Sequence, residues 1–337
     1  MTDSTPPASF SPDRYDHMPY RRCGRWGLKL PAISLGTWET FGGYRDSDVA
    51  RACLYRAFDL GITHFDLANN YGRPPGHAET IVGQIVRSMP RDELILSTKA
   101  GYRMWPGPCG EWGSRKHILA SLDQSLQRLG VDYVDLFYHH RPDPDTPLEE
   151  TLGALDQAVR SGKALYTAVS NYSGARLAEA HQVIRDNRLS PVILHQPCYN
   201  LLRRGIETDL VPVAREHGTG IIVFCPLAQG LLTSKYLDGI PADSRAALWW
   251  GEDRGRRVEE VLPKVRALHA IARARGQSLA QLALCWILRL PEITSALIGA
   301  SRVEQIEENV AALSAPPLTP TELEQVDQIL AAPPTPA

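Results

Sequence analysis

Eight short apolar segments, separated by amphipathic stretches, are the feature that most limits how this chain can fold. They lie at 33–37, 62–68, 94–100, 133–140, 164–170, 192–196, 220–226 and 294–299. Short apolar segments that alternate with helical patterns predict strands joined by crossovers, and crossovers require parallel pairing. The count of eight, within 337 residues, favours closure into a barrel over an open, doubly wound sheet. We therefore predict an α/β fold, a (β/α)8 TIM barrel.

The stretches between these segments carry residues that start and end helices. Asp46 opens a helical stretch that ends near Gly61, and Ser114 opens another that ends at Gly130. A Ser or Thr followed three residues later by Glu predicts a capping box. That spacing begins at Thr146, Ser301 and Thr319. The last of these predicts an extra C-terminal helix.

The remaining segments define the predicted domain. Residues 20–33 predict a β-hairpin that turns near 24–27. No boundary interrupts 20–330, which predicts a single barrel domain with flexible tails at 1–19 and 331–337. The stretch 226–256 is an oversized loop after the seventh strand. Long loops in compact domains are often lids.

Composition disfavours several classes of function. A net charge of −2 gives no electrostatic reason to bind nucleic acid or an anionic membrane. No signal peptide and no apolar run of about 20 residues occurs. The six cysteines are scattered without CxxC, and HxH and HExxH are also missing, which argues against a metal site. We expect a cytoplasmic protein without a metal and leave homo-oligomer formation open.

Polar residues close the second, third and fourth predicted strands. Asp66 and Tyr71 follow the second, Lys99 ends the third, and His139 and His140 end the fourth. Catalytic groups of a barrel lie where the strands end, so these side chains are predicted to converge at one mouth. Taken singly, each has an ordinary structural interpretation. Only the combination indicates catalysis.

The combination suits reduction of a carbonyl group by hydride delivery. A free phenol has a pKa of about 10, and we expect the ammonium of Lys99 to lower the pKa of Tyr71 and improve it as a proton donor. Asp66 would hold Lys99 in place. A histidine would donate a hydrogen bond to the carbonyl oxygen and polarise it.

Eight ordered segments of the chain resemble the aldo-keto reductases. They are ISLGTW, HFDLANNYG, STKAGY, YVDLFYHHRPD, AVSNYS, HQPCYN, FCPLAQGLLTSKYLDGIP and LIGASRVEQIEEN. The resemblance covers about residues 20–330 and is closest to the bacterial L-glyceraldehyde 3-phosphate reductases, which are related to potassium-channel β subunits. It implies a catalytic tetrad of Asp66, Tyr71, Lys99 and His140. His140 is preferred over His139 because it lies two residues before Pro142 and only one of the two can face the barrel interior.

The resemblance also implies a nicotinamide cofactor. The implied contacts are Thr37, Trp38, Asp66, Ser170, Asn171, Gln196, Phe224, Cys225, Pro226, Leu227, Ala228, Gln229, Lys235, Arg245, Gly299, Ser301, Arg302, Gln305, Glu308 and Asn309. Many members carry Arg in place of Gln305 and Lys in place of Gly299. Ser301 and Arg302 remain to bind a 2′-phosphate, so we expect NADPH to be preferred over NADH, but moderately. Asp243 lies where the channel subunits carry Tyr, and no contact is transferred to it.

The implied activity is NADPH-dependent reduction of small aldehydes, such as L-glyceraldehyde 3-phosphate and methylglyoxal. Candidate substrate-rim residues are Arg103, Trp105, Trp112 and Arg141. The alternative is a binding subunit that senses the nicotinamide redox state beside a membrane partner. His140 argues against this alternative, because the channel subunits it resembles carry Asn there.

Overall fold

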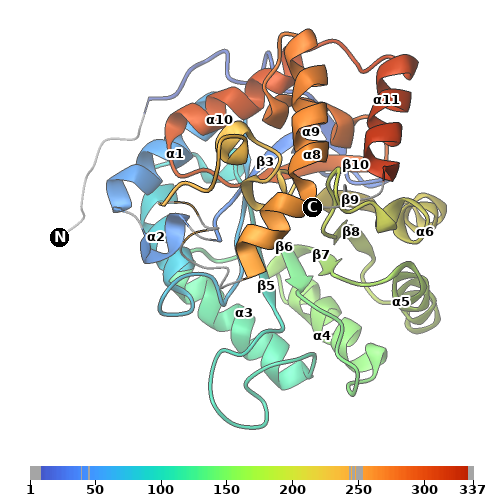
Figure 1. The fold of residues 1–337 in the computed structure, drawn as a ribbon. Helices are drawn as coiled ribbons and strands as arrows, with labels where there is room; N and C mark the ends of the chain where they lie inside the picture. The colour runs from blue at the N-terminus through green and yellow to red at the C-terminus, as the bar shows by residue number, and fades with distance from the viewer. Residues whose placement is uncertain are drawn as a thin grey trace.

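The computed structural model of the chain describes residues 9–38, 40–44, 46–242, 244, 247 and 253–332. Within them, eight parallel strands close into a barrel in the order β10-β3-β4-β5-β6-β7-β8-β9 (Figure 1). These strands are β3 (Ile33–Gly36), β4 (His64–Asp66), β5 (Ile95–Ala100), β6 (Val134–His139), β7 (Ala164–Ser170), β8 (Val192–Gln196), β9 (Gly220–Val223) and β10 (Ile293–Ile298). Each lies inside or within one residue of a predicted segment, so the predicted barrel is confirmed.

A ring of helices surrounds the barrel (Figure 1). It consists of α1 (Ser47–Asp59), α2 (His77–Val86), α3 (Arg115–Leu129), α4 (Leu148–Arg160), α5 (Gly174–Asn187), α6 (Leu210–His217), α9 (Leu279–Leu288) and α10 (Val303–Val310). Two predicted boundaries are confirmed by their caps. The side chain of Asp46 accepts from the Asp48 amide at the start of α1, and Ser114 accepts from the His117 amide at the start of α3.

Two of the three predicted capping boxes are wrong. The Thr146 hydroxyl donates to Asp143 Oδ2 at 2.6 Å and does not cap α4. At α10 the direction is reversed, since the Ser301 amide donates to Gln305 Oε1 at 2.8 Å. The box at Thr319 is confirmed: the Thr319 side chain accepts from the Glu322 amide, and Glu322 Oε2 accepts from the Thr319 amide at 2.7 Å. In the two failures a nearby side chain supplied a competing partner.

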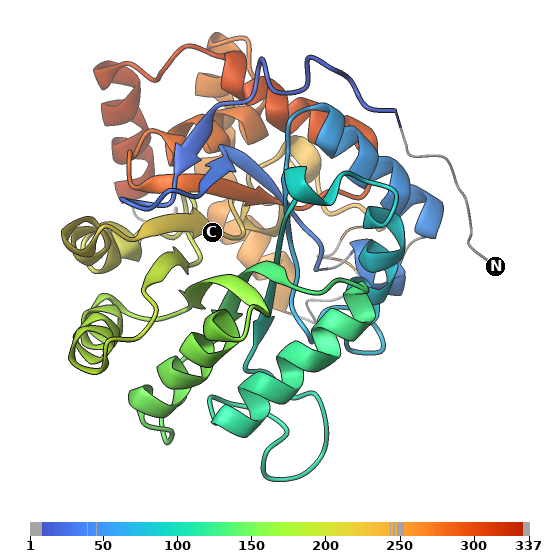
Figure 2. The ribbon, with the colours of Figure 1, turned by 180° about the vertical axis from the view of Figure 1, so that it is seen from behind.

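The predicted hairpin covers the end of the barrel where the strands begin (Figure 2). It pairs β1 (Tyr20–Arg22) with β2 (Lys29–Pro31) in antiparallel register. Its turn rests on the chain just before β9, where the Arg25 amide donates to the Gly218 carbonyl at 3.1 Å. At Gly24 the backbone has a φ of +59°, and a Cβ would lie 2.1 Å from that carbonyl oxygen, so no larger residue fits.

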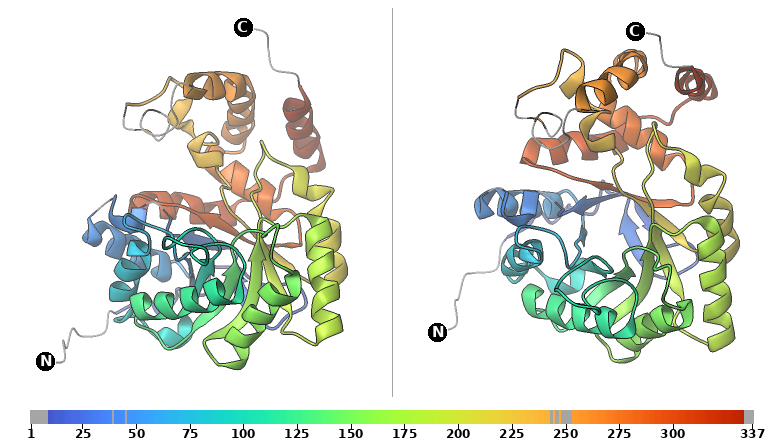
Figure 3. Two further views of the ribbon diagram at one scale, coloured as in Figure 1. Left: turned by 90° about the horizontal axis from the view of Figure 1, so that it is seen from below. Right: turned by 60° about the horizontal axis from the view of Figure 1, so that its bottom comes forward.

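Two further helices, α8 (Asp253–Ala274) and α11 (Pro320–Ala331), lie side by side outside the ring (Figure 3). The Lys264 ammonium joins them by donating to the Leu330 carbonyl at 2.7 Å. Helix α11 confirms the predicted C-terminal helix. The predicted loop 226–256 contains two short helices, η4 (Ala228–Gly230) and η5 (Ser234–Tyr236), and the first turn of α8.

Residues 9–19, which we assigned to a flexible tail, contact α1. The Phe10 ring packs edge-on against Phe58 with centroids 4.8 Å apart, and the Ser11 amide donates to Asp59 Oδ1 at 2.8 Å. Residues 1–8 and 333–337 of the assigned tails lie outside the described part. No helix in the described part of the chain is long and apolar enough to cross a membrane.

Side chains alternate between the inside and the outside of the barrel. On β6, Leu136 and Tyr138 belong to the inner apolar cluster, whereas Phe137 between them packs in the outer core. The inner cluster also contains Ala168, Leu194 and Ile222. It fills the barrel beside β6 to β9, and polar side chains of β3, β4, β5 and β10 complete the interior.

Candidate active site

A buried ion pair lies where β4 and β5 end. Asp66 is the last residue of β4, and its Oδ2 accepts from Lys99 Nζ at 2.5 Å, with both side chains fully buried. Oδ1 accepts from Ser97 Oγ at 2.6 Å and from Gln196 Nε2 at 3.1 Å. Lys99 also donates to the Leu67 carbonyl at 2.7 Å. Buried charges are stable when they are paired and hydrogen-bonded in this way.

Tyr71 follows in the loop after β4 and lies against the same pair. Its ring centroid is 5.2 Å from Lys99 Nζ and 5.9 Å from the centroid of the His140 ring. The Tyr71 carbonyl accepts from the amides of Gly76 and Ala78, at 3.1 and 3.2 Å, which fixes the loop on α2. The structure therefore brings together all four residues of the predicted tetrad.

The two adjacent histidines have different surroundings. The ring of His140 packs edge-on against Tyr102, with centroids 4.7 Å apart, on the side of Tyr71. His139 Nδ1 lies 2.8 Å from the Tyr172 hydroxyl. Alternation along the strand separates them, as expected, and they do not converge on one site.

Burial controls the protonation of the site. It raises the pKa of Tyr71 well above its usual range, and the carboxylate of Asp66 raises it further. The lowered pKa that we expected for Tyr71 is therefore not found, because burial outweighs any stabilisation of the phenolate by Lys99, which is itself paired with Asp66. Burial, together with Lys99, also holds the pKa of His140 well below its usual range. At neutral pH the site therefore presents a protonated phenol and a neutral imidazole, and both groups can donate a hydrogen bond to one oxygen atom.

Comparison with known proteins agrees with this geometry: residues 32–331 match the aldo/keto reductase family. The chain belongs to that family.

Its curated relatives include two kinds of protein. The chain is 53% identical over 329 residues to the L-glyceraldehyde 3-phosphate reductase of Escherichia coli (strain K12), with 95% of each chain covered. It is 40% identical over 322 residues to a probable voltage-gated potassium channel subunit beta of Arabidopsis thaliana, covering 93% of this chain and 97% of that one. A putative subunit of the same kind from Schizosaccharomyces pombe (strain 972 / ATCC 24843) is also 40% identical over 328 residues, covering 93% of this chain and 94% of that one.

Aldo/keto reductases generally use NADH or NADPH, and several predicted contacts of this reductase meet at the ends of β7 and β8. The Ser170 hydroxyl donates to the Gln196 carbonyl at 2.8 Å, and Asn171 Nδ2 donates to the His140 carbonyl at 3.0 Å. On the other side of the mouth, Thr37 Oγ1 donates to the Asp66 carbonyl at 3.0 Å. These polar groups surround the tetrad and fit the carboxamide group of a nicotinamide ring held beside it.

The segment after β9 has the strained backbone that often marks a ligand site. Cys225, Ala228 and Gln229 have φ of +55°, +47° and +59°, a region that favours glycine. Lys235, an exposed residue, follows in the same segment. Strained turns with a cation nearby fit a pyrophosphate. Among the neighbouring predicted contacts, the structure shows Trp38 exposed, Pro226 buried, and Phe224 and Leu227 half-buried.

The residues predicted to contact the adenosine end of the cofactor differ in how exposed they are. Arg302 is exposed, with Nε 3.7 Å from Glu304 Oε2, and Gly299 and Glu308 are exposed too. Gln305 accepts from Ser301, and Asn309 is only 3% exposed, so its side chain lies in the interior. Arg245 and Asp243 lie outside the described residues.

The rim next to His140 carries a stacked arginine. The Arg141 guanidinium lies 3.6 Å from the ring centroid of Trp112 and 4.3 Å from that of Tyr102, and it pairs with Glu111 Oε2 at 2.7 Å. Trp105 packs on His117 with centroids 5.0 Å apart, and Arg103 is exposed. Sequence reasoning did not single out Tyr102, although it is the last residue of the STKAGY segment.

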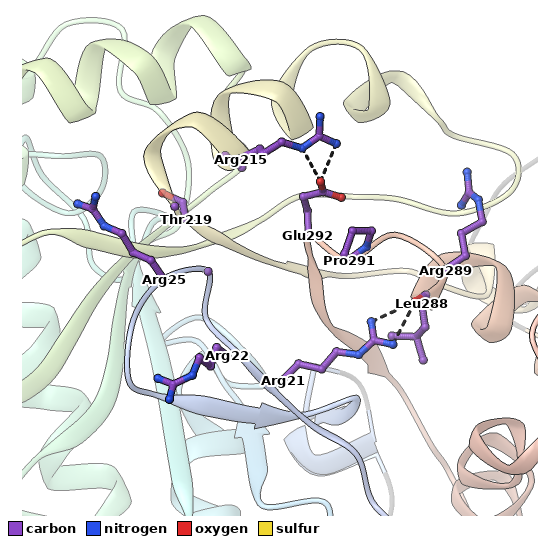
Figure 4. A pocket seen from close by; sticks show the side chains of 12 residues that line it. Arg21, Arg22, Arg25, Arg215, Thr219, Leu288, Arg289, Pro291 and Glu292 are labelled. Carbon is purple, nitrogen blue, oxygen red and sulfur yellow. Dashed lines mark hydrogen bonds and ion pairs between the residues drawn. The ribbon is translucent and has the colours of Figure 1, made fainter.

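A second cluster of arginines lies around a pocket at the opposite end of the barrel, beside the hairpin (Figure 4). Arg21 donates to the carbonyls of Leu288 and Ile293, at 3.0 and 2.9 Å, and Arg215 pairs with Glu292 at 2.6 Å. Arg289 also lines it and pairs with a carboxylate. The Arg21 bonds join the hairpin to the end of α9 and the start of β10, away from the tetrad.

Proposed function

We propose that this reductase transfers a hydride from NADPH to small aldehydes, with Tyr71 as the general acid. The observation that carries the proposal is the meeting of a protonated Tyr71 and a neutral His140 beside the buried pair of Asp66 and Lys99. The neutral imidazole donates to the carbonyl oxygen and polarises it. Tyr71 then gives its proton to the forming alkoxide, and the Lys99 ammonium stabilises the phenolate left behind.

The cofactor supplies only the hydride when it is bound. The predicted contacts around the tetrad would hold the nicotinamide of the cofactor. The strained segment after β9 would hold its pyrophosphate, and the exposed Arg302 would bind its 2′-phosphate. The reaction consumes one proton and yields an alcohol, so Tyr71 must recover a proton from solvent after each turnover.

We propose L-glyceraldehyde 3-phosphate as a favoured substrate, with methylglyoxal as a poorer one. The name of the Escherichia coli relative and the charge of Arg141 beside His140 support a phosphorylated aldehyde. Glu111 pairs with this guanidinium at 2.7 Å. A phosphate would replace that carboxylate, whereas methylglyoxal has no group to do so.

The test measures NADPH oxidation by the purified full-length protein with both aldehydes. Arg141→Gln should raise KM for L-glyceraldehyde 3-phosphate about tenfold or more, the value of one charge-assisted hydrogen bond, and should leave methylglyoxal reduction nearly unchanged. Arg103→Gln, at an exposed rim residue on the preceding loop between β5 and α3, is the matched control. Equal losses of activity with both aldehydes would refute the role of Arg141 in binding the phosphate. No turnover by the wild type would refute the proposed enzymatic function.

Cofactor preference has its own test. Arg302 is exposed at the start of α10 and free to turn from Glu304 toward a 2′-phosphate. Wild-type KM for NADPH should be about tenfold below that for NADH, and Arg302→Ala should raise only the former. An equal or lower KM for NADH in the wild type would contradict the assignment.

The similarity to potassium channel subunits supports a second candidate, a binding subunit that senses the nicotinamide redox state. It predicts tight cofactor binding with very slow oxidation, and the same assay separates the two. We also propose a cytoplasmic location without nucleic-acid or membrane partners, consistent with the net charge of −2. Size-exclusion chromatography would settle homo-oligomer formation.

A further inference from the structure

A line of hydrogen-bonded side chains runs inside the barrel to the catalytic carboxylate. It starts at Ser295 on β10 and passes through Ser34 on β3, His64 on β4 and Ser97 on β5 before it reaches Asp66. The successive distances are 2.6 Å between the Ser295 and Ser34 hydroxyls, 2.9 Å to His64 Nδ1, 3.0 Å from His64 Nε2 to Ser97 Oγ, and 2.6 Å to Asp66 Oδ1. All five side chains are fully buried.

The direction of every bond in this line follows from its last member. An ionised carboxylate only accepts, so the single proton of Ser97 must point to Asp66. Ser97 Oγ can then only accept from His64, which places the imidazole proton on Nε2. In a neutral ring Nδ1 is the acceptor, so Ser34 donates to it, and Ser295 donates to Ser34. All protons point toward Asp66.

We propose that His64, as the Nε2–H tautomer, is a positioning residue for the reduction. It acts through Ser97 and does not touch the reacting atoms. A serine hydroxyl rotates freely unless a partner restricts it. The imidazole proton occupies the Ser97 oxygen, directs the serine proton to Asp66 Oδ1, and leaves Oδ2 to Lys99. The proposal deepens the function proposed above and rests on it only in its kinetic part.

The protonation of His64 agrees with this geometry. Burial lowers the pKa of His64 to about 4, while Asp66 on its own strand acts to raise it and Lys99 on β5 lowers it. The facing residues of β3 and β10 are serines, which carry no charge. A doubly protonated ring would donate from both nitrogens, and Ser34 could no longer point toward it.

Nitrogen NMR of histidine-labelled protein tests the tautomer without any catalytic assay. The wild-type spectrum, with the His64→Gln variant for assignment, should show His64 protonated at Nε2 and unprotonated at Nδ1 between about pH 5 and pH 8, where a free histidine titrates. Ser97→Ala removes the acceptor that fixes the proton on Nε2 and should populate both tautomers. An Nδ1–H form in the wild type, or titration near pH 6.5, would overturn the proposal.

Kinetics test the positioning role. His64→Leu should lower kcat at least about tenfold with little change in KM for NADPH, because a hydrogen bond to the reacting machinery is lost. His64→Gln, which offers an amide donor and a carbonyl acceptor, should recover most of kcat. Ser121→Ala removes a buried hydroxyl on α3, outside the barrel, and is the control.

Equal kcat losses for the two His64 variants, or a change in KM alone, would refute the role. If His64→Leu does not fold, Ser97→Ala still tests the line, since it removes the hydroxyl between His64 and Asp66 and should lower kcat without changing KM. A wild type that reduces no aldehyde would instead refute the proposed function. The NMR test of the His64 tautomer does not depend on that activity.

Discussion

Replacing Tyr71 by Phe would remove one oxygen atom from the site and should abolish most aldehyde reduction. The aromatic ring stays, so its packing beside Lys99 and His140 is preserved. In the wild type the ring centroids of Tyr71 and His140 lie 5.9 Å apart. What is lost is the proton donor. General acid catalysis is worth about 10² to 10⁴-fold, which corresponds to roughly 2.7 to 5.4 kcal/mol of transition-state stabilisation.

The structure adds a pH signature to this prediction. Burial raises the pKa of Tyr71 well above its usual range, so the phenol keeps its proton under alkaline conditions. The wild-type kcat should therefore show no loss from ionisation of Tyr71 up to about pH 10, the pKa of a free phenol. A lowered pKa, as the sequence alone suggested, would place that loss below pH 10.

The assay follows NADPH oxidation at saturating aldehyde and measures cofactor affinity separately. Tyr71→Phe should bind NADPH nearly as tightly as the wild type. Tyr55→Phe, which removes a phenol oxygen from α1 far from the mouth, is the matched control and should keep full activity. If Tyr71→Phe retains more than about a tenth of wild-type kcat, Tyr71 is not the principal acid, because such a loss is below the range of acid catalysis.

Three further predictions concern other residues. His140→Ala should lower kcat/KM about 100-fold or more, while His139→Ala should affect stability more than turnover; equal kinetic losses would show that the strand register is wrong. Burial lowers the pKa of His195 to about 3, below the value of about 6.5 in the unfolded chain, so its contribution to stability is present above pH 6.5 and is lost as pH falls. Urea unfolding measures how the free energy of unfolding changes with pH. Between pH 6 and pH 4 this slope should be smaller for His195→Gln than for the wild type by about 1.4 kcal/mol per pH unit, and an unchanged slope would contradict this. A hydrogen bond with Cys225 lowers the pKa of Cys198 to about 7, so iodoacetamide at neutral pH should alkylate Cys198 first; peptide mass spectrometry that finds another cysteine labelled first would refute it.

Much of the fold was predictable because it depends on local patterns. Eight apolar segments with helical stretches between them require parallel strands with crossovers, and the count of eight closes the barrel. The caps at Asp46 and Ser114 were predicted because each acts on its own helix. The tetrad was predictable for a related reason: residues that end neighbouring parallel strands must meet at the same mouth.

Other features depend on partners that are distant in sequence. Thr146 had the right spacing for a cap, but Asp143 took its hydroxyl. The pKa of Tyr71 was expected to fall because Lys99 was nearby, whereas in the folded protein burial raises this pKa and the Asp66 carboxylate, which pairs with Lys99, raises it further. Neither outcome could be read from a motif, since each depends on which of several close groups actually makes contact.

His64 shows the difference between sequence and tertiary structure most clearly. The sequence already determined that His64 and Asp66 lie on one face of a short strand, because side chains alternate with a period of two. It contained no indication of Ser34, Ser97 or Ser295 as partners. These serines come from three other strands, and only the register of the closed barrel brings their hydroxyls within hydrogen-bonding distance. The direction of the bonds then follows from the one charged group at the end of the line, because each hydroxyl has a single proton to donate.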